Sequence, residues 1–332
     1  MQRILNQPAD YVDEMLEGIY DAYPEQVCCL GGDLRCLVKK KITPGKVGII
    51  TGGGSGHLPL FLGYVGDGLL DGCGVGGVFQ SPSSMQLYEL TKAVNQGAGV
   101  LYIYGNYGGD IMNFDMAKEM AEMEDIAVEQ FIAGDDVASA PNSEMEKRRG
   151  VAGIFYVYKI AGAAAAGMLS LKEVRRLACK AAENTRTMGV ALSACIVPEI
   201  GKPSFEISDG EMEIGMGIHG ESGIRKGALK TADEIVEELL SNILPDLPYE
   251  SGCEVSVLVN GLGGTPKEEL FIVYRKTSRI LKEKGIRIYN NYIGEFATSM
   301  EMAGVSVSLL KLDQELKKYL SAPCETPFFV QR

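Results

Sequence analysis

Histidine is scarce in this sequence, which has two, and tryptophan is absent. Two histidines and eight scattered cysteines, with no C-x-x-C pair, do not provide the ligand spacing of a metal site. Positive charge is also limited, because 32 Lys and Arg stand against 44 Asp and Glu, for a formal net charge of −12. This balance argues against nucleic acid and anionic membranes as partners, since both bind basic surfaces. We therefore expect no metal, no nucleic acid and no membrane partner, and any phosphate must be held by backbone amides or by a partner.

Long apolar runs are missing as well. No run approaches the about 20 residues of a membrane-spanning helix, and the N-terminus has no basic segment followed by an apolar stretch. Scattered cysteines in a chain of 332 residues are typical of buried thiols in a cytosolic protein. We therefore expect a cytoplasmic protein that is large enough for two domains.

Apolar segments and amphipathic segments alternate along the chain, which predicts an α/β fold. We expect two α/β domains with mixed sheets flanked by helices, and an active site between glycine-rich loops. The boundary is expected near residues 185–189, giving domains over residues 1–186 and 187–332. The predicted helices cover residues 9–23, 87–95, 111–124, 154–167, 171–187, 232–244, 270–284 and 313–320. The predicted strands cover residues 47–50, 99–104, 127–132, 189–196, 213–218, 254–259, 287–293 and 304–310.

Both histidines lie in glycine-rich loops. His57 ends the stretch GIITGGGSGH, and His219 lies in GMGIHGES. Because glycine has no Cβ, a ligand or another backbone segment can approach closely at such loops. We predict that the strand over residues 47–50 ends in a turn at the glycines, and that the two loops meet over one small ligand. The glycines that flank His219 are expected to leave its ring open to that ligand. An ordinary strand-to-helix turn is the alternative, since GGGSGH fits neither G-x-G-x-x-G nor a Walker A loop.

Asp110 follows a second glycine-rich turn, GNYGG, and precedes a predicted helix. An aspartate at such a junction is either a helix N-cap or a catalytic group. For an isolated aspartate the N-cap is the more common case. Residues 66–77 are also rich in glycine and are expected to form a loop.

An ordered set of motifs resembles the substrate-binding subunit of dihydroxyacetone kinase. The motifs are TGGGSGH, GYVGDGLLDG with VFQSPS, NYGGDIMNF, DDVA, RRGVAG, IGKPSF, EIGMGIHGE and NGLGGTP. The resemblance implies that a ketone binds covalently to His219 as a hemiaminal. It also implies that His57 and Asp110 hydrogen-bond a substrate hydroxyl and assist its deprotonation. Further substrate-lining residues implied by the resemblance are Gly54, Ser55 and Gly56.

The same resemblance implies the partners. In that family the phosphoryl donor comes from a separate nucleotide-binding subunit of the DhaL type, which is often rephosphorylated by the sugar phosphotransferase system. ADP or ATP with magnesium would then belong to that partner, and we expect no cofactor on this chain. The expected substrate is dihydroxyacetone or a related short ketose, and the expected assembly is a homodimer.

Two residues depart from the family pattern. Leu58 follows His57 where the family usually has glutamate, and Gly105 stands where the dihydroxyacetone enzymes usually have a substrate-contacting lysine. Loss of a cation and of its volume predicts weaker binding of the smallest ketose and room for a larger one, such as a four-carbon ketose.

Three functions are compatible with these observations. The first is a kinase subunit, and the second is a ketone-sensing coactivator of a transcription factor, as some paralogues of this subunit are. Presence of His57 and Asp110 beside His219 favours the enzyme, because a sensor needs only the binding residue. The ordered motifs argue against the third, an unrelated phosphate-binding α/β protein.

Overall fold

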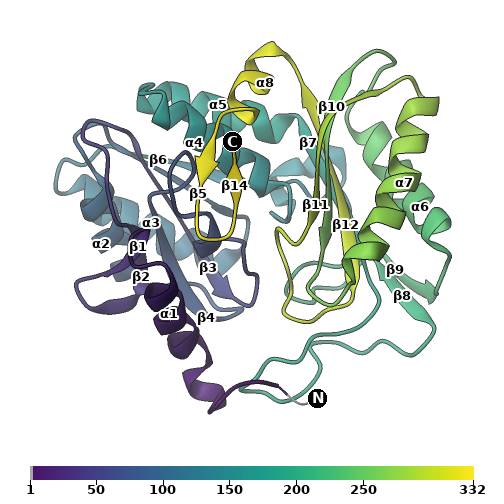
Figure 1. Cartoon of the computed structure of the whole chain (residues 1–332), viewed down its shortest axis with the longest axis horizontal. Coiled ribbons are helices and arrows are strands. Elements are labelled where there is room, and N and C mark those ends of the chain that lie inside the picture. Colours follow the sequence, from purple (N-terminus) through teal and green to yellow (C-terminus); the bar gives the residue numbers. More distant parts are fainter. Residues whose placement is uncertain (1–2) are drawn as a thin grey trace.

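Two mixed β-sheets stand side by side, with helices on their outer faces and between them (Figure 1). The structure is a computed structural model and describes residues 3–332. Both sheets have six strands and combine parallel with antiparallel pairs, which confirms the predicted α/β class with mixed sheets. No helix within residues 3–332 is long and apolar enough to cross a bilayer.

The first sheet comes from residues 27–133 and places the glycine-rich strand near its middle. Its strands β3, β4, β5 and β6 run parallel, and the hairpin β1–β2 adds antiparallel strands at one edge. In spatial order the strands are β1 (Val27–Leu30), β2 (Asp33–Lys39), β4 (Gly72–Val78), β3 (Gly48–Ser55), β5 (Val100–Gly105) and β6 (Val128–Ala133).

The second sheet is largely antiparallel, with one parallel pair between β10 and β11. In spatial order its strands are β11 (Arg287–Gly294), β10 (Glu254–Gly261), β12 (Gly304–Leu312), β7 (Thr185–Ala191), β8 (Glu211–Ile214) and β9 (Arg225–Ala228). A two-stranded sheet of β13 (Cys324–Glu325) and β14 (Val330–Gln331) lies between the two large sheets in Figure 1.

The helices bury apolar faces against both sheets. Helices α2 and α3 cover one face of the first sheet, and α6 and α7 cover the outer face of the second. The α-helices are α1 (Tyr11–Ala22), α2 (Ser84–Val94), α3 (Gly108–Glu122), α4 (Ile154–Ala166), α5 (Leu171–Glu183), α6 (Ala232–Asp246), α7 (Lys267–Glu283) and α8 (Gln314–Leu320). Short 3₁₀ turns cover Pro8–Asp10, Leu62–Tyr64 and Asn142–Lys147.

Helix α4 joins the two sheets. Every residue from Ile154 to Ala165 is buried, as the alanine-rich sequence predicts for a closely packed helix. Its two tyrosines reach in different directions: the Tyr156 hydroxyl donates to Ser256 Oγ of β10 at 2.9 Å, and the Tyr158 hydroxyl lies 2.7 Å from Thr51 Oγ1 of β3. The two halves of the chain are therefore held on one common helix.

The C-terminal segment returns to the first half of the chain. The Glu325 N–H donates to the Asp67 carbonyl at 2.9 Å, and Thr326 Oγ1 donates to the Gly63 carbonyl at 2.8 Å. Residues 324–326 thus pack on the first half although they follow the second sheet. The proposed division at residues 186 and 187 remains a prediction, and it cuts the chain inside β7.

Two glycine-rich predictions were wrong. Strand β3 does not end at Ile50 but continues through the glycines to Ser55, and the expected loop over residues 66–77 contains the central strand β4. The cause is close packing rather than a turn: a Cβ on Gly54 would lie 2.7 Å from the Phe79 backbone, and one on Gly74 would lie 2.9 Å from the Leu87 side chain. The glycines therefore let neighbouring segments approach the sheet.

Candidate active site

His57 follows the end of β3 and is fixed by the second half of the chain. Its ring Nδ1 lies 2.7 Å from the carbonyl oxygen of Thr298, and the Met300 N–H donates to the Gly56 carbonyl at 2.7 Å. A carbonyl only accepts, so Nδ1 carries the proton and Nε2 keeps its lone pair. Residues 241 positions apart in the chain thus set the tautomer of this histidine.

The His57 ring is enclosed by aromatic side chains. It stacks on Phe79 with ring centroids 4.9 Å apart, and Phe61 meets it edge-on. Its Nε2 is buried and has no hydrogen-bond partner within residues 3–332. Burial, together with the nearby His219, lowers the pKa of His57 to about 3. His57 is therefore a neutral hydrogen-bond acceptor.

His219 lies in the loop between β8 and β9 and meets His57 directly. The two rings are 4.6 Å apart at an interplanar angle of 86°, and the Tyr107 ring stands 4.6 Å from His219 on another side. The two histidine loops therefore meet, as the sequence predicted. The His219 side chain is 20% exposed, and the access of a ligand to its ring remains a prediction.

Glu221 holds both the ring and the backbone of His219. Its Oε1 lies 3.0 Å from His219 Nδ1, and its Oε2 accepts the His219 N–H at 3.0 Å. Burial works against ionisation of this carboxyl, but the hydrogen bonds and charge of His219 outweigh it and lower the pKa of Glu221 to about 2. Sequence reasoning missed Glu221, although a carboxylate two residues after a functional histidine was a readable signal.

Asp110 is in the first turn of α3, and it is not the N-cap of that helix. The N-cap is Tyr107, which makes no side-chain cap. The Asp110 side chain is buried, and its Oδ1 has no hydrogen-bond partner in the described part of the chain. Burial raises its pKa to about 6, against the opposing effects of a hydrogen bond with Ser81 and of His219. A buried carboxyl that titrates near neutral pH is suited to accept a proton from a ligand.

The space directly beside Gly105 is occupied by the Tyr107 ring, and the expectation of a roomier pocket remains a prediction. A Cβ at this position would lie 2.9 Å from the Tyr107 ring, whose hydroxyl donates to the Gly150 carbonyl at 3.0 Å. The ring that faces His219 thus occupies the volume beside Gly105. Leu58 is partly buried and packs against the core of the first half.

The three predicted lining residues before His57 lie against the Phe79 segment. Ser55 Oγ donates to the Gly76 carbonyl at 2.8 Å, so neighbouring strand β4 already satisfies this hydroxyl. Gly56 has φ +101°, and a Cβ there would lie 2.8 Å from the Phe79 ring. With Gly54, these residues bring the Phe79 and His57 rings together. Their contact with substrate remains a prediction.

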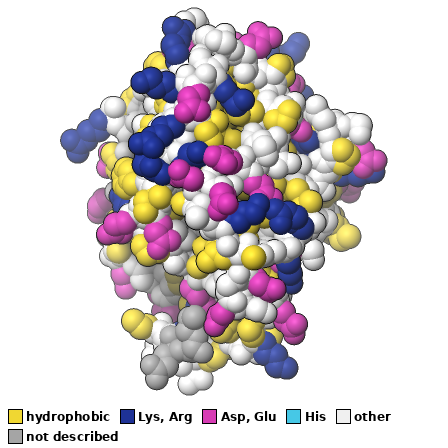
Figure 2. All heavy atoms as spheres, turned by 90° about the vertical axis from the view of Figure 1, so that its right-hand side faces the viewer, with side chains coloured by type: hydrophobic (Ala, Val, Ile, Leu, Met, Phe, Trp, Pro, Cys, Tyr) yellow, Lys and Arg dark blue, Asp and Glu magenta, His cyan; other side chains and the backbone are white. Residues whose placement is uncertain are grey.

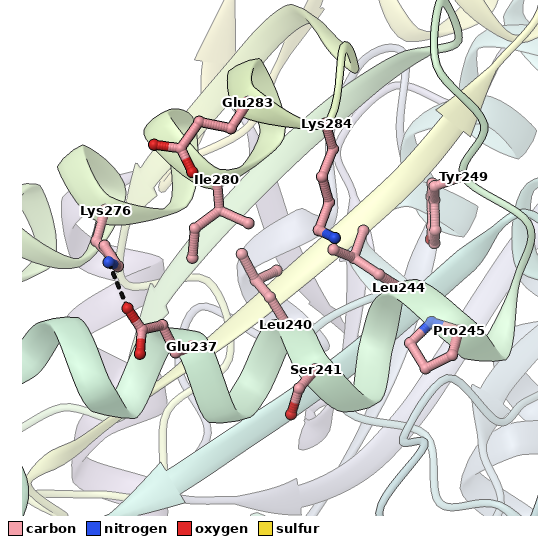
Figure 3. A pocket seen from close by; sticks show the side chains of 10 residues that line it. All are labelled: Glu237, Leu240, Ser241, Leu244, Pro245, Tyr249, Lys276, Ile280, Glu283 and Lys284. Atoms are coloured by element: carbon pink, nitrogen blue, oxygen red, sulfur yellow. Dashed lines mark ion pairs between the residues drawn. The ribbon is translucent and has the colours of Figure 1, made fainter.

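A separate groove lies away from both histidines. It measures about 590 Å³ between α6 and α7, with an apolar floor of Leu240, Leu244 and Ile280 and a Lys276–Glu237 ion pair of 2.5 Å at one end (Figure 3). The surrounding face mixes acidic and basic side chains (Figure 2). Neither histidine nor Asp110 lines this groove. Among residues 3–332, no group of three or more His, Cys, Asp or Glu side chains is arranged to hold a metal ion.

The two α/β halves meet at a histidine pair with a buried aspartate nearby, and these residues form a candidate site between glycine-rich loops. Residues 17–328 match the Dak1 domain, and the chain belongs to that family. It is 47% identical over 330 residues to a Listeria innocua protein named PTS-dependent dihydroxyacetone kinase 2, dihydroxyacetone-binding subunit DhaK, covering 99% of each chain. It is 42% identical to an L-erythrulose kinase of Pectobacterium atrosepticum, covering 99% of this chain and 56% of that one.

Solved structures with the same fold include proteins that are named for dihydroxyacetone kinase. The dihydroxyacetone kinase of C. freundii matches with a TM-score of 0.89 and 32% identity, covering 99% of this chain and 60% of that one. A protein described as the dihydroxyacetone kinase operon co-activator Dha-DhaQ matches with a TM-score of 0.90 and 33% identity, covering 96% and 98%. The family resemblance predicted from the motifs is confirmed.

Proposed function

We propose that this chain is the ketose-binding subunit of a dihydroxyacetone kinase-type phosphotransferase, and that it binds the ketose covalently on His219. The observation that carries the proposal is the direct meeting of the His57 and His219 rings, 4.6 Å apart. One ring nitrogen of His219 attacks the carbonyl carbon, the π electrons of the carbonyl move to its oxygen, and that oxygen takes a proton to give a hemiaminal. Only a carbonyl compound reacts in this way, so polyols are excluded.

His57 and Asp110 act on the hydroxyl that receives the phosphoryl group. The buried Nε2 of His57 accepts a hydrogen bond from this hydroxyl and orients it. Asp110 takes its proton, because its pKa of about 6 is closer to the working pH than the pKa of His57, which is about 3. The two residues therefore share the work as orienting acceptor and general base.

The substrate is dihydroxyacetone or a four-carbon ketose such as erythrulose. Relatives that are named for dihydroxyacetone binding and relatives that are named erythrulose kinases are 47% and 42% identical to this chain. Gly105 supports the larger substrate, because no cation extends from this position. The Tyr107 ring beside Gly105 then limits the size of the ketose that can bind.

The phosphoryl donor is supplied by a separate nucleotide-binding subunit of the DhaL type, which carries ADP or ATP with magnesium. Relatives with the DhaK name are called PTS- or PEP-dependent, which supports a phosphotransferase-linked donor. We propose a cytoplasmic location and a homodimeric assembly for the chain.

A second candidate function is ketone sensing. The likeness to the Dha-DhaQ co-activator covers 96% of this chain. The fold is therefore compatible with a kinase subunit and with a ketone sensor. A sensor does not need a general base, and the buried Asp110 beside the histidines favours the kinase subunit.

A kinase assay decides between these functions. The chain is incubated with a panel of ketoses, including dihydroxyacetone and both erythrulose enantiomers, with and without its nucleotide-binding subunit. We expect phosphorylation only when both subunits are present, and no ATP binding to the isolated chain by calorimetry. Ketose binding without phosphorylation in the presence of an active nucleotide-binding subunit would support the sensor instead.

A further inference from the structure

The His219 ring is held by a single carboxylate that also holds its backbone. Glu221 receives the ring Nδ1 on Oε1 and the His219 N–H on Oε2, each at 3.0 Å. A carboxylate that binds two groups of one residue restrains both the position of that residue and the rotation of its ring. No comparable polar contact holds His219 Nε2 within residues 3–332.

The loop that carries Glu221 is fixed in turn by Arg149. This guanidinium donates to the Gly215 carbonyl at 2.8 Å and to Asp136 Oδ2 at 3.0 Å, and it also reaches the Glu221 carbonyl at 3.5 Å. Gly217 makes room for the arrangement, because a Cβ there would overlap the Glu221 carboxylate. The glycine before His219 therefore accommodates Glu221, whereas the sequence suggested that it leaves space for substrate.

The chemistry of the two groups fixes the tautomer. Glu221 is ionised because its pKa is about 2, and a carboxylate offers only acceptors. The ring nitrogen beside it must therefore carry a proton. In a neutral imidazole the other nitrogen, Nε2, then has the free lone pair.

We propose that Glu221 is the positioning residue for His219, holding the Nδ1–H tautomer so that Nε2 is the atom that attacks the ketose carbonyl. This inference rests on the proposed function. The Nε2 electron pair forms the nitrogen–carbon bond, the carbonyl π pair moves to oxygen, and that oxygen takes a proton from water, which leaves as hydroxide to solvent. The ring becomes an imidazolium whose charge lies beside the Glu221 carboxylate, which stabilises the adduct by a charge-assisted hydrogen bond.

Nitrogen NMR of the histidine rings tests the tautomer without any ligand. The chain has only two histidines, so selective ¹⁵N labelling gives two ring systems. At pH 8.5 we expect His219 as the Nδ1–H tautomer in the wild type and as a mixture of tautomers in Glu221→Ala. His57 reports on folding, because its Nδ1 is held by the Thr298 carbonyl and its signals should stay unchanged. A wild-type His219 in the Nε2–H tautomer would overturn the inference.

Titration with [2-¹³C]dihydroxyacetone measures the adduct, since the carbonyl signal moves to that of a saturated carbon. Glu221→Ala should weaken adduct formation by about 10- to 100-fold, on the scale of a lost charged hydrogen bond. Glu221→Gln, which keeps one acceptor for Nδ1–H, should recover part of this loss. Glu213→Ala is the matched control, because Glu213 binds the Gly223 N–H of the same loop at 2.8 Å. The control should leave the His219 tautomer and the adduct unchanged.

The two proposals fail in different ways. If Glu221→Ala binds within two-fold of the wild type, or if Glu213→Ala loses as much, Glu221 does not position the ring, whereas the covalent function stands. If the wild type forms no adduct with dihydroxyacetone or erythrulose, the proposed function fails. The ring tautomer then still decides whether Glu221 sets the protonation of His219.

Discussion

At the scale of single residues, burial determines what each polar group of the site can do. Asp110 and His57 are both buried, and for both the charged form is disfavoured. His57 therefore stays neutral, whereas Asp110 changes its charge near neutral pH. The chain thus keeps two groups in an environment that does not stabilise their charged forms, as is common where binding or catalysis requires it.

The raised pKa of Asp110 predicts a pH-dependent stability difference. The native state binds the Asp110 proton more tightly than the unfolded state, so wild-type stability falls as the pH rises from 3.8 to about 6. Asp110→Asn removes this loss. The free energy of unfolding of Asp110→Asn, relative to wild type, should therefore increase by ~2 kcal/mol between pH 4 and pH 7. Urea unfolding at a series of pH values measures it, and a difference that does not change with pH would contradict the assignment.

Gly105 and Tyr107 predict a change in substrate preference. Gly105→Lys adds a cation and pushes the Tyr107 ring, because even the Cβ would lie 2.9 Å from that ring. We expect kcat/KM for erythrulose, relative to dihydroxyacetone, to fall by about 10-fold or more, the scale set by one misplaced methylene group. Gly105→Ala separates the two effects, because it moves the ring without adding a charge. An unchanged ratio in Gly105→Lys would show that the Tyr107 ring does not limit the size of the ketose.

At the scale of elements, the His219 loop depends on a glycine. A Cβ at Gly217 would overlap the Glu221 carboxylate and lie 2.6 Å from Arg149 Nη1. Gly217→Ala should therefore destabilise the protein by about 1–3 kcal/mol, as overpacking does, and weaken the ketose adduct. Gly18→Ala is the matched control on α1, where nothing lies within 4 Å of the new Cβ, and it should stabilise by about 1 kcal/mol. Thermal unfolding compares the stability of the two variants. A Gly217→Ala variant that is as stable as the wild type would contradict the packing of this loop.

The elements also show where sequence patterns succeed and fail. Helix α4 was predictable, because the alanine-rich run that follows Lys159 favours a closely packed environment. Strand β4 was not, since its glycines resemble those of a loop. They are explained by the close packing of Leu87 and Leu90 of α2, and of Gln80, against the strand. The end of β3 could not be predicted for the same reason, because Gly54 packs closely against the Phe79 backbone.

The site was predictable in part. The two histidines and their glycine-rich loops could be singled out because the chain has no other histidine, whereas Asp110 was singled out only by the family motif NYGGD. The Thr298 carbonyl that orients His57 and the Tyr107 ring that fills the space beside Gly105 were not. Backbone acceptors and ring positions depend on how distant segments meet, which no local pattern encodes.

At the scale of the whole molecule, one ion cluster connects the halves. Arg148, which is 0% exposed, binds Asp246 at the end of α6 through two nitrogens at 2.6 and 2.8 Å, and Arg186 binds the same carboxylate. Asp246→Ala would leave two buried guanidiniums without their counter-ion and should destabilise the fold by about 3–5 kcal/mol. Removing the exposed partner of Arg175, in Glu129→Ala, should change stability by less than about 1 kcal/mol. Urea unfolding measures the free energy of unfolding of both variants. A loss in Asp246→Ala as small as that in Glu129→Ala would mean that the cluster does not join the halves.

In the proposed function, the two halves of the chain meet around a ketose that is held covalently on His219. A crystal of the chain soaked with dihydroxyacetone, and a second soaked with erythrulose, test it most directly. We expect continuous density at bonding distance between Nε2 of His219 and the former carbonyl carbon, with a substrate hydroxyl near His57 and Asp110. A well-ordered ketose bound only by hydrogen bonds, with the His219 ring outside bonding range, would contradict it.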